Sequence, residues 1–322
     1  MNRLRRGWTR LTGAQRGVEA VRAEVLDLSR RLEAMQQLLD ADVDTAATLH
    51  NVAGSLADHG SRLERITRIL QAIYDREPEN RRRLWALRSS PEYELAYSEP
   101  EPLVSVLIPT YDNYEDLCER AIPSVLAQSY QNIELVIIGE GSPPETAQRI
   151  KRFKDPRIRY ERLPLRGPYP DDPRDRWLVT AVPPFNHGLH VARGRWISPF
   201  ADDDALRPEA LLATLTAART NRYEVCYGAL QGLGPNGWKR LYYSESPRFA
   251  EMGLQGGVFH AGLRFIDQEL ADALFDISSD WSMIRRMWRA GVRFGSIKTI
   301  VCDYYPGQLW KAAAASDDNA AD

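Results

Sequence analysis

The sequence predicts an α/β domain with a mostly parallel sheet, preceded by a long helical region. Two short runs rich in Val, Ile and Leu, residues 103–108 and 133–138, flank a stretch at 114–128 whose apolar residues have helical spacing. A strand, a helix and a second strand at this separation form a βαβ unit with parallel strands. Ligands of such sheets bind in loops at the carboxyl ends of the strands. The residues that follow the two strands are therefore the first candidates for a site.

The helical region is predicted for residues 1–76, which contain no proline. Two series of apolar residues at steps of three and four, from Val18 to Leu39 and from Leu49 to Ile73, follow the a/d pattern of a coiled coil. The register slips between the series, so the helix either continues through the slip or folds back as a hairpin. Such a helix cannot bury its apolar stripe alone, so we expect a homo-oligomer formed through these helices, with docking onto the α/β domain as the alternative.

The first 16 residues hold five arginines and no acid, interleaved with Leu4, Trp8 and Leu11. This tip is either a peripheral contact with anionic lipid or a solvated basic end, and both interpretations stay open. No run of about 20 apolar residues and no signal-peptide core occurs, and the three cysteines are widely spaced. We expect a cytoplasmic protein, located at the inner face of the membrane if the tip binds lipid.

The remaining chain is predicted to contain a linker, one domain and a tail. Residues 77–102 carry four prolines among many charges and indicate a linker with a short helix around 81–87. The α/β domain is expected at 103–307, before a disordered small-residue and acidic tail at 308–322. A net charge of -2 provides no basic field, so no nucleic-acid partner is expected.

Three consecutive carboxylates, Asp202, Asp203 and Asp204, follow the apolar run at 196–200, and Pro208 then opens an amphipathic helix. Adjacent carboxylates repel one another, and a bound cation would remove that cost. Mg²⁺ or Mn²⁺ takes oxygen ligands and completes its shell with phosphate oxygens and water. The alternative is an acidic loop that only caps the following helix.

Four motifs together resemble glycosyltransferase family 2, which has the GT-A fold. They occur in the order of that family at residues 104–111 (VSVLIPTY), 124–142 (SVLAQSY to EGS), 186–208 (NHG to DDD and the proline) and 279–281 (SDW). The resemblance implies a nucleotide-sugar donor, with UDP-sugar favoured, and a glycan, glycolipid or protein acceptor with a free hydroxyl. It also implies an inverting transfer, because a single base is evident and no carboxylate nucleophile is.

The resemblance assigns roles to individual residues. Asp280 would be the general base, and Mg²⁺ or Mn²⁺ would bind to Asp203 and Asp204. The donor-binding residues implied are Pro109, Thr110, Tyr111, Glu140, Asn186, Asp202 and Asp203.

The chain departs from the family pattern at three positions. Ala201 stands where the acidic run usually begins, Glu140 replaces an Asp that would accept a hydrogen bond from the base, and Ser279 replaces a Glu. These departures leave an alternative function open, a degenerate transferase domain serving as a coiled-coil scaffold. Asp280 itself has a plain structural interpretation as a helix N-cap.

Overall fold

The computed structural model describes residues 27, 29–31, 33, 45–234 and 239–305. The predicted basic tip, all apolar residues of the first series and the predicted tail lie outside the described residues. The chain divides into two compact units, Met1–Glu77 and Pro78–Asp322. The boundary falls one residue after the predicted end of the helical region.

The described part of the first unit is dominated by helix α2, Thr45–Tyr74. Three leucines spaced by seven residues lie along it, and 56% of Leu56, 47% of Leu63 and 39% of Leu70 are exposed. The predicted helix is present over Thr45–Tyr74, and its pairing as a coiled coil stays a prediction. No helix in the described ranges is both long and apolar enough to cross a bilayer.

The linker predicted at 77–102 is corrected by the structure, which has two helices there. Helix α3, Glu77–Arg88, contains the short helix predicted around 81–87, and helix α4 spans Pro91–Ser98. Leu84 and Tyr93 are 2% exposed, and Ala96 is fully buried. The prolines that suggested a linker include Pro91, which occupies the first turn of α4, where a missing N–H costs nothing. From Pro78 onward this segment is therefore part of the second unit and contributes to its core.

A nine-stranded sheet forms the centre of the second unit, in the order β3-β2-β1-β4-β8-β6-β9-β5, with β7 paired to β6. Strands β3, β2, β1 and β4 are mutually parallel, whereas β8 is antiparallel to both of its neighbours. The strand bounds are β1 Val104–Thr110, β2 Ile133–Glu140, β3 Ile158–Leu163, β4 Trp196–Pro199, β5 Ala205–Leu206, β6 Val225–Leu233, β7 Lys239–Tyr242, β8 Val258–His260 and β9 Phe294–Tyr304.

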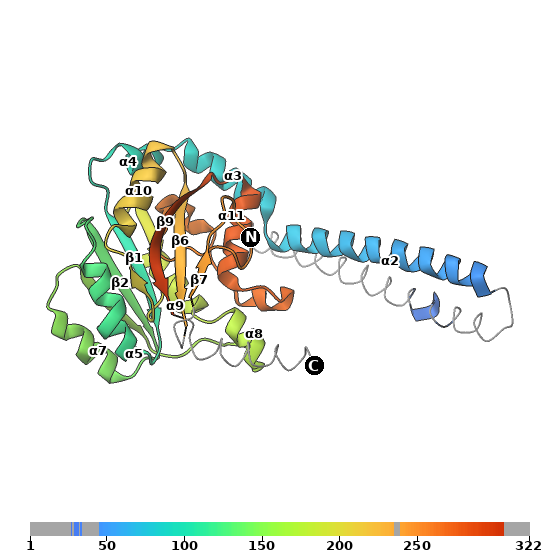
Figure 1. Cartoon of the computed structure of the whole chain (residues 1–322), viewed down its shortest axis with the longest axis horizontal. Helices are drawn as coiled ribbons and strands as arrows, with labels where there is room; N and C mark the ends of the chain where they lie inside the picture. Colours follow the sequence, from blue (N-terminus) through green and yellow to red (C-terminus); the bar gives the residue numbers. More distant parts are fainter. Residues whose placement is uncertain (1–26, 28, 32, 34–44, 235–238, 306–322) are drawn as a thin grey trace, which may run out of the picture. The chain divides into compact units, whose positions relative to one another are not determined.

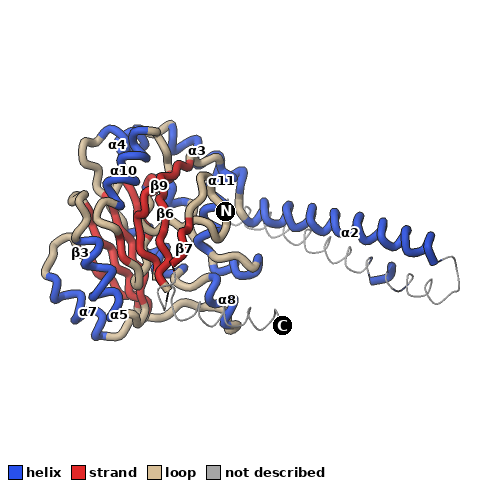
Figure 2. Tube along the Cα trace, viewed as in Figure 1, coloured by secondary structure: helices blue, strands red, loops and turns tan. Residues whose placement is uncertain are grey.

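Helices cover both faces of this sheet, as Figures 1 and 2 show. Side chains alternate along β1, so that Val106 lies in one buried cluster with residues of α4, α6 and α10, and Leu107 in another with residues of α3, α9 and α11. Burial on both faces explains why the strands are apolar throughout. The remaining helices are α5 Tyr114–Asp116, η1 Leu117–Ala121, α6 Ile122–Leu126, α7 Pro144–Ile150, η2 Lys151–Phe153, α8 Pro173–Leu178, α9 Val182–Val191, α10 Ala210–Thr220, η4 Ala261–Phe265, η5 Leu270–Phe275 and α11 Ser279–Ala290.

The predicted βαβ unit is confirmed. Strands β1 and β2 are parallel, with Val104 opposite Ile133 and Thr110 opposite Gly139. The helical segment between them is continuous from α5 through a π-helical turn to α6. Helix α10 begins at Ala210, two residues later than predicted from Pro208.

Candidate functional site

The carboxyl ends of the parallel strands bring several predicted site residues to one edge of the sheet. Strand β1 ends at Thr110 and β2 at Glu140, while β4 ends at Pro199, just before the acidic loop. Thr110 donates a hydrogen bond from Oγ1 to Asp202 Oδ2 over 2.7 Å, and Asn113 Nδ2 donates to Asp202 Oδ1 over 3.3 Å. Asp202 therefore ties the acidic loop to the end of β1.

The three carboxylates of the acidic loop lie in a poorly solvated environment. Burial raises the pKa of Asp202 to about 7 and raises the pKa of Asp203 and, further still, that of Asp204. The charge of Asp203 adds to the effect of burial at both neighbours. Asp204 Oδ1 accepts a hydrogen bond from the Tyr305 backbone N–H over 2.9 Å. The Asp203 carbonyl oxygen accepts one from Arg120, whose guanidinium stacks on the Tyr305 ring.

The chemistry of this loop fits a divalent cation, although the loop alone does not complete a metal site. Asp204 Oδ2 is buried without a hydrogen-bond partner among the described residues. Such an oxygen is costly, and a cation would satisfy it. Within the described ranges, no three His, Cys, Asp or Glu side chains gather as metal ligands. A metal on Asp203 and Asp204 would take its other ligands from phosphate oxygens and water.

Glu140 is buried at the end of β2 and holds the segment that follows β3. It accepts hydrogen bonds from the Gly167 backbone N–H over 2.9 Å and from the Tyr169 hydroxyl over 2.6 Å. A Cβ atom on Gly167 would lie 2.9 Å from a Glu140 oxygen, so this close approach requires glycine. The guanidinium of Arg166 lies 4.1 Å from the Tyr111 ring centre. Tyr111 thus flanks a loop anchored by Glu140.

The side chain of Asn186, on helix α9, forms two hydrogen bonds with the backbone of Gln268. Its Nδ2 donates to the Gln268 carbonyl over 2.8 Å, and its Oδ1 accepts from the Gln268 N–H over 3.1 Å. This reciprocal pair uses one donor and one acceptor of the amide. The structure therefore gives Asn186 a positioning role for the segment that precedes α11, and its predicted contact with the donor stays a prediction.

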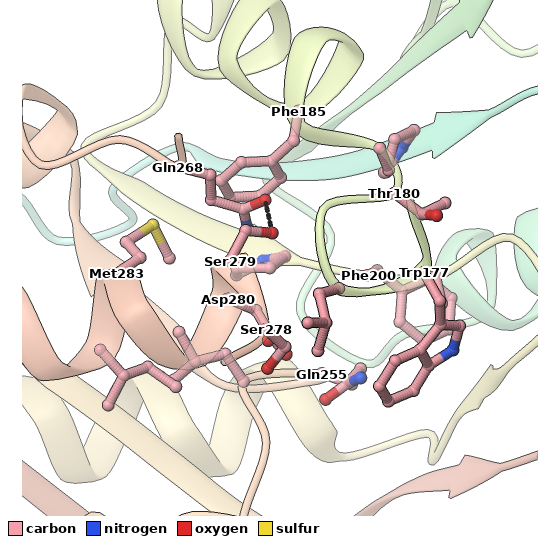
Figure 3. Close-up of a pocket in the computed structure, with 17 residues that line it drawn as sticks. Trp177, Thr180, Phe185, Phe200, Gln255, Gln268, Ser278, Ser279, Asp280 and Met283 are labelled. Carbon is pink, nitrogen blue, oxygen red and sulfur yellow. Dashed lines mark hydrogen bonds between the residues drawn. The ribbon is translucent and has the colours of Figure 1, made fainter. Parts of the chain in front are cut away.

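A cavity of about 390 Å³ lies at the ends of β1 and β4 and is also lined by residues of α8, α9 and α11 (Figure 3). Trp177 and Gln255 lie on one side of it, and Phe185 and Gln268 on the other. Of residues 201–204, only Ala201 lines the cavity. The other lining residues are Pro109, Leu178, Thr180, Ala181, Pro199, Phe200, Leu254, Ser278, Ser279, Asp280, Met283 and Ile284.

Asp280 reaches this cavity from the first turn of α11. The N-cap residue of α11 is Ser278, so the alternative interpretation of Asp280 as the N-cap is wrong. Asp280 is exposed, and its Oδ1 accepts a hydrogen bond from the Trp281 backbone N–H over 2.7 Å. Ser279, by contrast, is buried and donates to Gln268 Oε1 over 3.0 Å. Asp280 is therefore the carboxylate of this turn that can meet a ligand.

Several residues that line the cavity were not predicted from the sequence. Trp177 and Thr180 come from α8 and the turn after it, and Gln255 comes from an irregular segment before β8. Ala181 is in the left-handed region with φ of 70°, which is uncommon for a residue other than glycine. The one available signal was a tryptophan within a polar, proline-rich stretch, and 42% of Trp177 is exposed.

Parallel strands with an acidic loop at their edge, faced by a carboxylate on a later helix, define a GT-A-like domain. The crystal structure of S. aureus TarS 1–349 in complex with UDP-GlcNAc shares this fold with a TM-score of 0.50 at 16% identity, over 64% of this chain and 59% of that chain. Residues 105–169 match the profile described as Glycosyl transferase family 2. The part of the chain at residues 105–169 therefore resembles glycosyltransferase family 2, as the motifs predicted.

Two relatives show how far the similarity extends. The succinoglycan biosynthesis protein ExoO of Rhizobium meliloti is 29% identical over 145 residues, which are 45% of this chain and 38% of the relative. An uncharacterized glycosyltransferase of Haemophilus influenzae is 31% identical over 173 residues, which are 52% of this chain and 63% of the relative. The chain thus matches less than two thirds of the length of either relative.

Proposed function

We propose that the chain is an inverting, metal-dependent glycosyltransferase that moves a sugar from a UDP-sugar to a hydroxyl group in polysaccharide synthesis. The match of residues 105–169 to the Glycosyl transferase family 2 profile supports glycosyl transfer. The UDP-GlcNAc bound by TarS supports UDP as the nucleotide, and the role of ExoO in succinoglycan biosynthesis supports a glycan product. The observation that carries the mechanism is the exposed carboxylate of Asp280 in the cavity beside the strand ends.

In this mechanism Asp280 takes the proton of the acceptor hydroxyl as the acceptor oxygen forms its bond to the anomeric carbon. The bond between that carbon and the diphosphate breaks, and UDP leaves with the electron pair. One displacement inverts the anomeric configuration. A divalent cation on Asp203 and Asp204 would offset the charge of the leaving diphosphate. Thr110 and Asn113 support this by holding Asp202, and with it the acidic loop, against β1.

The decisive experiment is Asp280→Asn. Asparagine keeps an oxygen for the Trp281 N–H, so the fold should hold, but it cannot accept a proton from the substrate. We expect transfer from UDP-sugar to fall by about 10² to 10⁴-fold with UDP affinity unchanged, since losing a positioned base has this effect. Asp276→Asn is the matched control, because Asp276 lies four residues earlier, pairs with Arg174 and does not line the cavity.

Turnover of the Asp280 variant at the control level would refute its role as the base. The scaffold alternative predicts a different result, no binding of UDP by the unmodified chain in the presence of Mn²⁺. Calorimetric titration of UDP therefore separates a transferase with a misassigned base from a degenerate domain.

A further inference from the structure

The cavity at Asp280 adjoins a second cavity, of about 250 Å³. The two cavities share five lining residues, which are Trp177, Gln255, Ser278, Asp280 and Ile284. The first cavity extends to Pro109 and Ala201 at the sheet edge, whereas the second extends to Tyr242 of β7 and to Phe249. Asp280 therefore lies where the two meet, as a base between a donor and an acceptor must.

Four aromatic side chains, those of Tyr242, Phe249, Trp281 and Tyr304, line the second cavity beyond Asp280. The ring centres of Phe249 and Trp281 are 5.8 Å apart, at an interplanar angle of 57°. Those of Tyr242 and Tyr304 are 5.9 Å apart, at 85°. Phe249 is 57% exposed, although an aromatic side chain of a soluble protein is ordinarily more buried. Exposed ring faces in a cavity favour a ligand with flat apolar faces, and a sugar ring offers such faces through its C–H groups.

One cationic side chain, Arg240, also lines the second cavity. Its guanidinium lies 4.8 Å from the Tyr242 ring centre, and it forms no ion pair with any residue that the structure describes. A guanidinium presents donors in a fork that matches a carboxylate or a phosphate. An arginine held over a ring and lacking an acidic partner is available to such an anion on a ligand.

We propose that the second cavity is the acceptor subsite and that it takes a carbohydrate acceptor bearing an anionic group, which pairs with Arg240 while a sugar ring packs on Trp281. The proposal rests on the proposed function, because it places the acceptor hydroxyl beside Asp280. It narrows the acceptor from glycan, glycolipid or protein to an acidic glycan.

The test is calorimetric binding of four tetrasaccharides to the full chain at low salt, two anionic (oligogalacturonate and hyaluronan) and two neutral (cellotetraose and chitotetraose). An anionic tetrasaccharide should bind about fivefold tighter than the neutral ones, the scale of one exposed ion pair. Arg240→Gln should abolish this preference. Lys239→Gln should preserve it, because Lys239 is an exposed cation on the same strand and does not line the cavity.

A second pair of variants tests the aromatic wall. Trp281→Ala should weaken binding of the preferred tetrasaccharide roughly tenfold through the loss of ring packing. Trp288→Ala is the control, because Trp288 lies on the same helix, is 51% exposed and packs on Phe294 outside the cavity. Failure of all four tetrasaccharides to bind, or equal effects of each variant and its control, would overturn the inference. UDP titrated in parallel separates the outcomes, because UDP binding without glycan binding refutes only the subsite, whereas glycan binding without UDP binding refutes the proposed function.

Discussion

Glu224 offers the sharpest test of how α3 and α4 are held to the sheet. Its carboxylate accepts hydrogen bonds from Arg88 Nε over 2.7 Å and Nη2 over 2.8 Å, from the Tyr93 hydroxyl over 2.8 Å and from the Arg293 N–H over 2.8 Å. The Glu224 side chain is fully buried, while 34% of the Arg88 side chain is exposed. Burial acts to raise the pKa of Glu224, but the hydrogen bonds from Arg88, Arg293 and Tyr93 outweigh it and lower the pKa below its ordinary value.

Glu224→Gln keeps the side-chain shape but places an NH₂ group against donors and leaves the Arg88 charge without its partner. Breaking one side of a buried pair costs roughly 3–5 kcal/mol, and the partial exposure of Arg88 puts our expectation at the lower end, about 3 kcal/mol. Glu94→Gln is the matched control, because Glu94 and its partner Arg222 are 57% and 45% exposed. Because that pair is exposed, Glu94→Gln should lower the free energy of unfolding by no more than about 1 kcal/mol.

The assay is urea denaturation of each variant as a function of pH. The folded pKa of Glu224 lies below its unfolded value, so its contribution to stability is present above the unfolded pKa and is lost as pH falls through the folded pKa. The free energy of unfolding should therefore drop on acidification by a larger amount in the unmodified chain than in Glu224→Gln. Equal destabilisation by the two variants at neutral pH would refute the view that burial makes the Glu224 pair strong.

Three further predictions concern the other parts of the chain. Deleting residues 1–76, which spares α3, should lower the subunit number measured by light scattering while UDP binding persists, and an unchanged subunit number would contradict assembly through α2. Asp203→Ala should abolish the gain in UDP affinity that Mn²⁺ provides in calorimetry, whereas an undiminished gain would place the metal elsewhere. Ala181→Gly should raise the free energy of unfolding by up to about 1 kcal/mol, because the left-handed conformation costs alanine more than glycine. A free energy of unfolding below that of the unmodified chain in urea denaturation would contradict this.

The local patterns of the sequence predicted the fold well where both faces of an element are buried. Strands β1 and β2 begin within one residue of the predicted positions. An uninterrupted apolar run is stable only where both of its faces are buried, which in a three-layer domain is the central sheet. The same reasoning predicted only part of α3 at 77–102 and missed α4, because charged residues on the exposed sides of these helices concealed a few buried side chains. Tyr93 and Tyr97 are anchored by Glu224 and by the Tyr223 carbonyl, more than 100 positions away, which no local pattern can reveal.

The site shows the same division between local and long-range information. Asp280 and the acidic loop were proposed from short motifs that resemble the family, at a helix start and after a strand end, and their roles stay predictions. The partners of Asp202 and Glu140 were not predicted, because Thr110 and Tyr169 reach them only through the folding of the sheet edge. Trp177 could not be placed in the cavity from sequence for the same reason.

The Ala201 departure has a physical consequence that only the structure exposes. Ala201 lines the cavity that contains Asp280, while Asp202 directs its two carboxylate oxygens to Thr110 and Asn113. The position that carries an acid in the resembled family pattern thus presents a methyl group to the cavity, and the neighbouring acid is already satisfied within the loop. Asp204 retains one buried oxygen without a hydrogen-bond partner in the described ranges. Any cation at this loop must therefore depend on Asp203 and Asp204, which is why the Asp203 variant, rather than one at Asp202, bears directly on the proposed metal dependence.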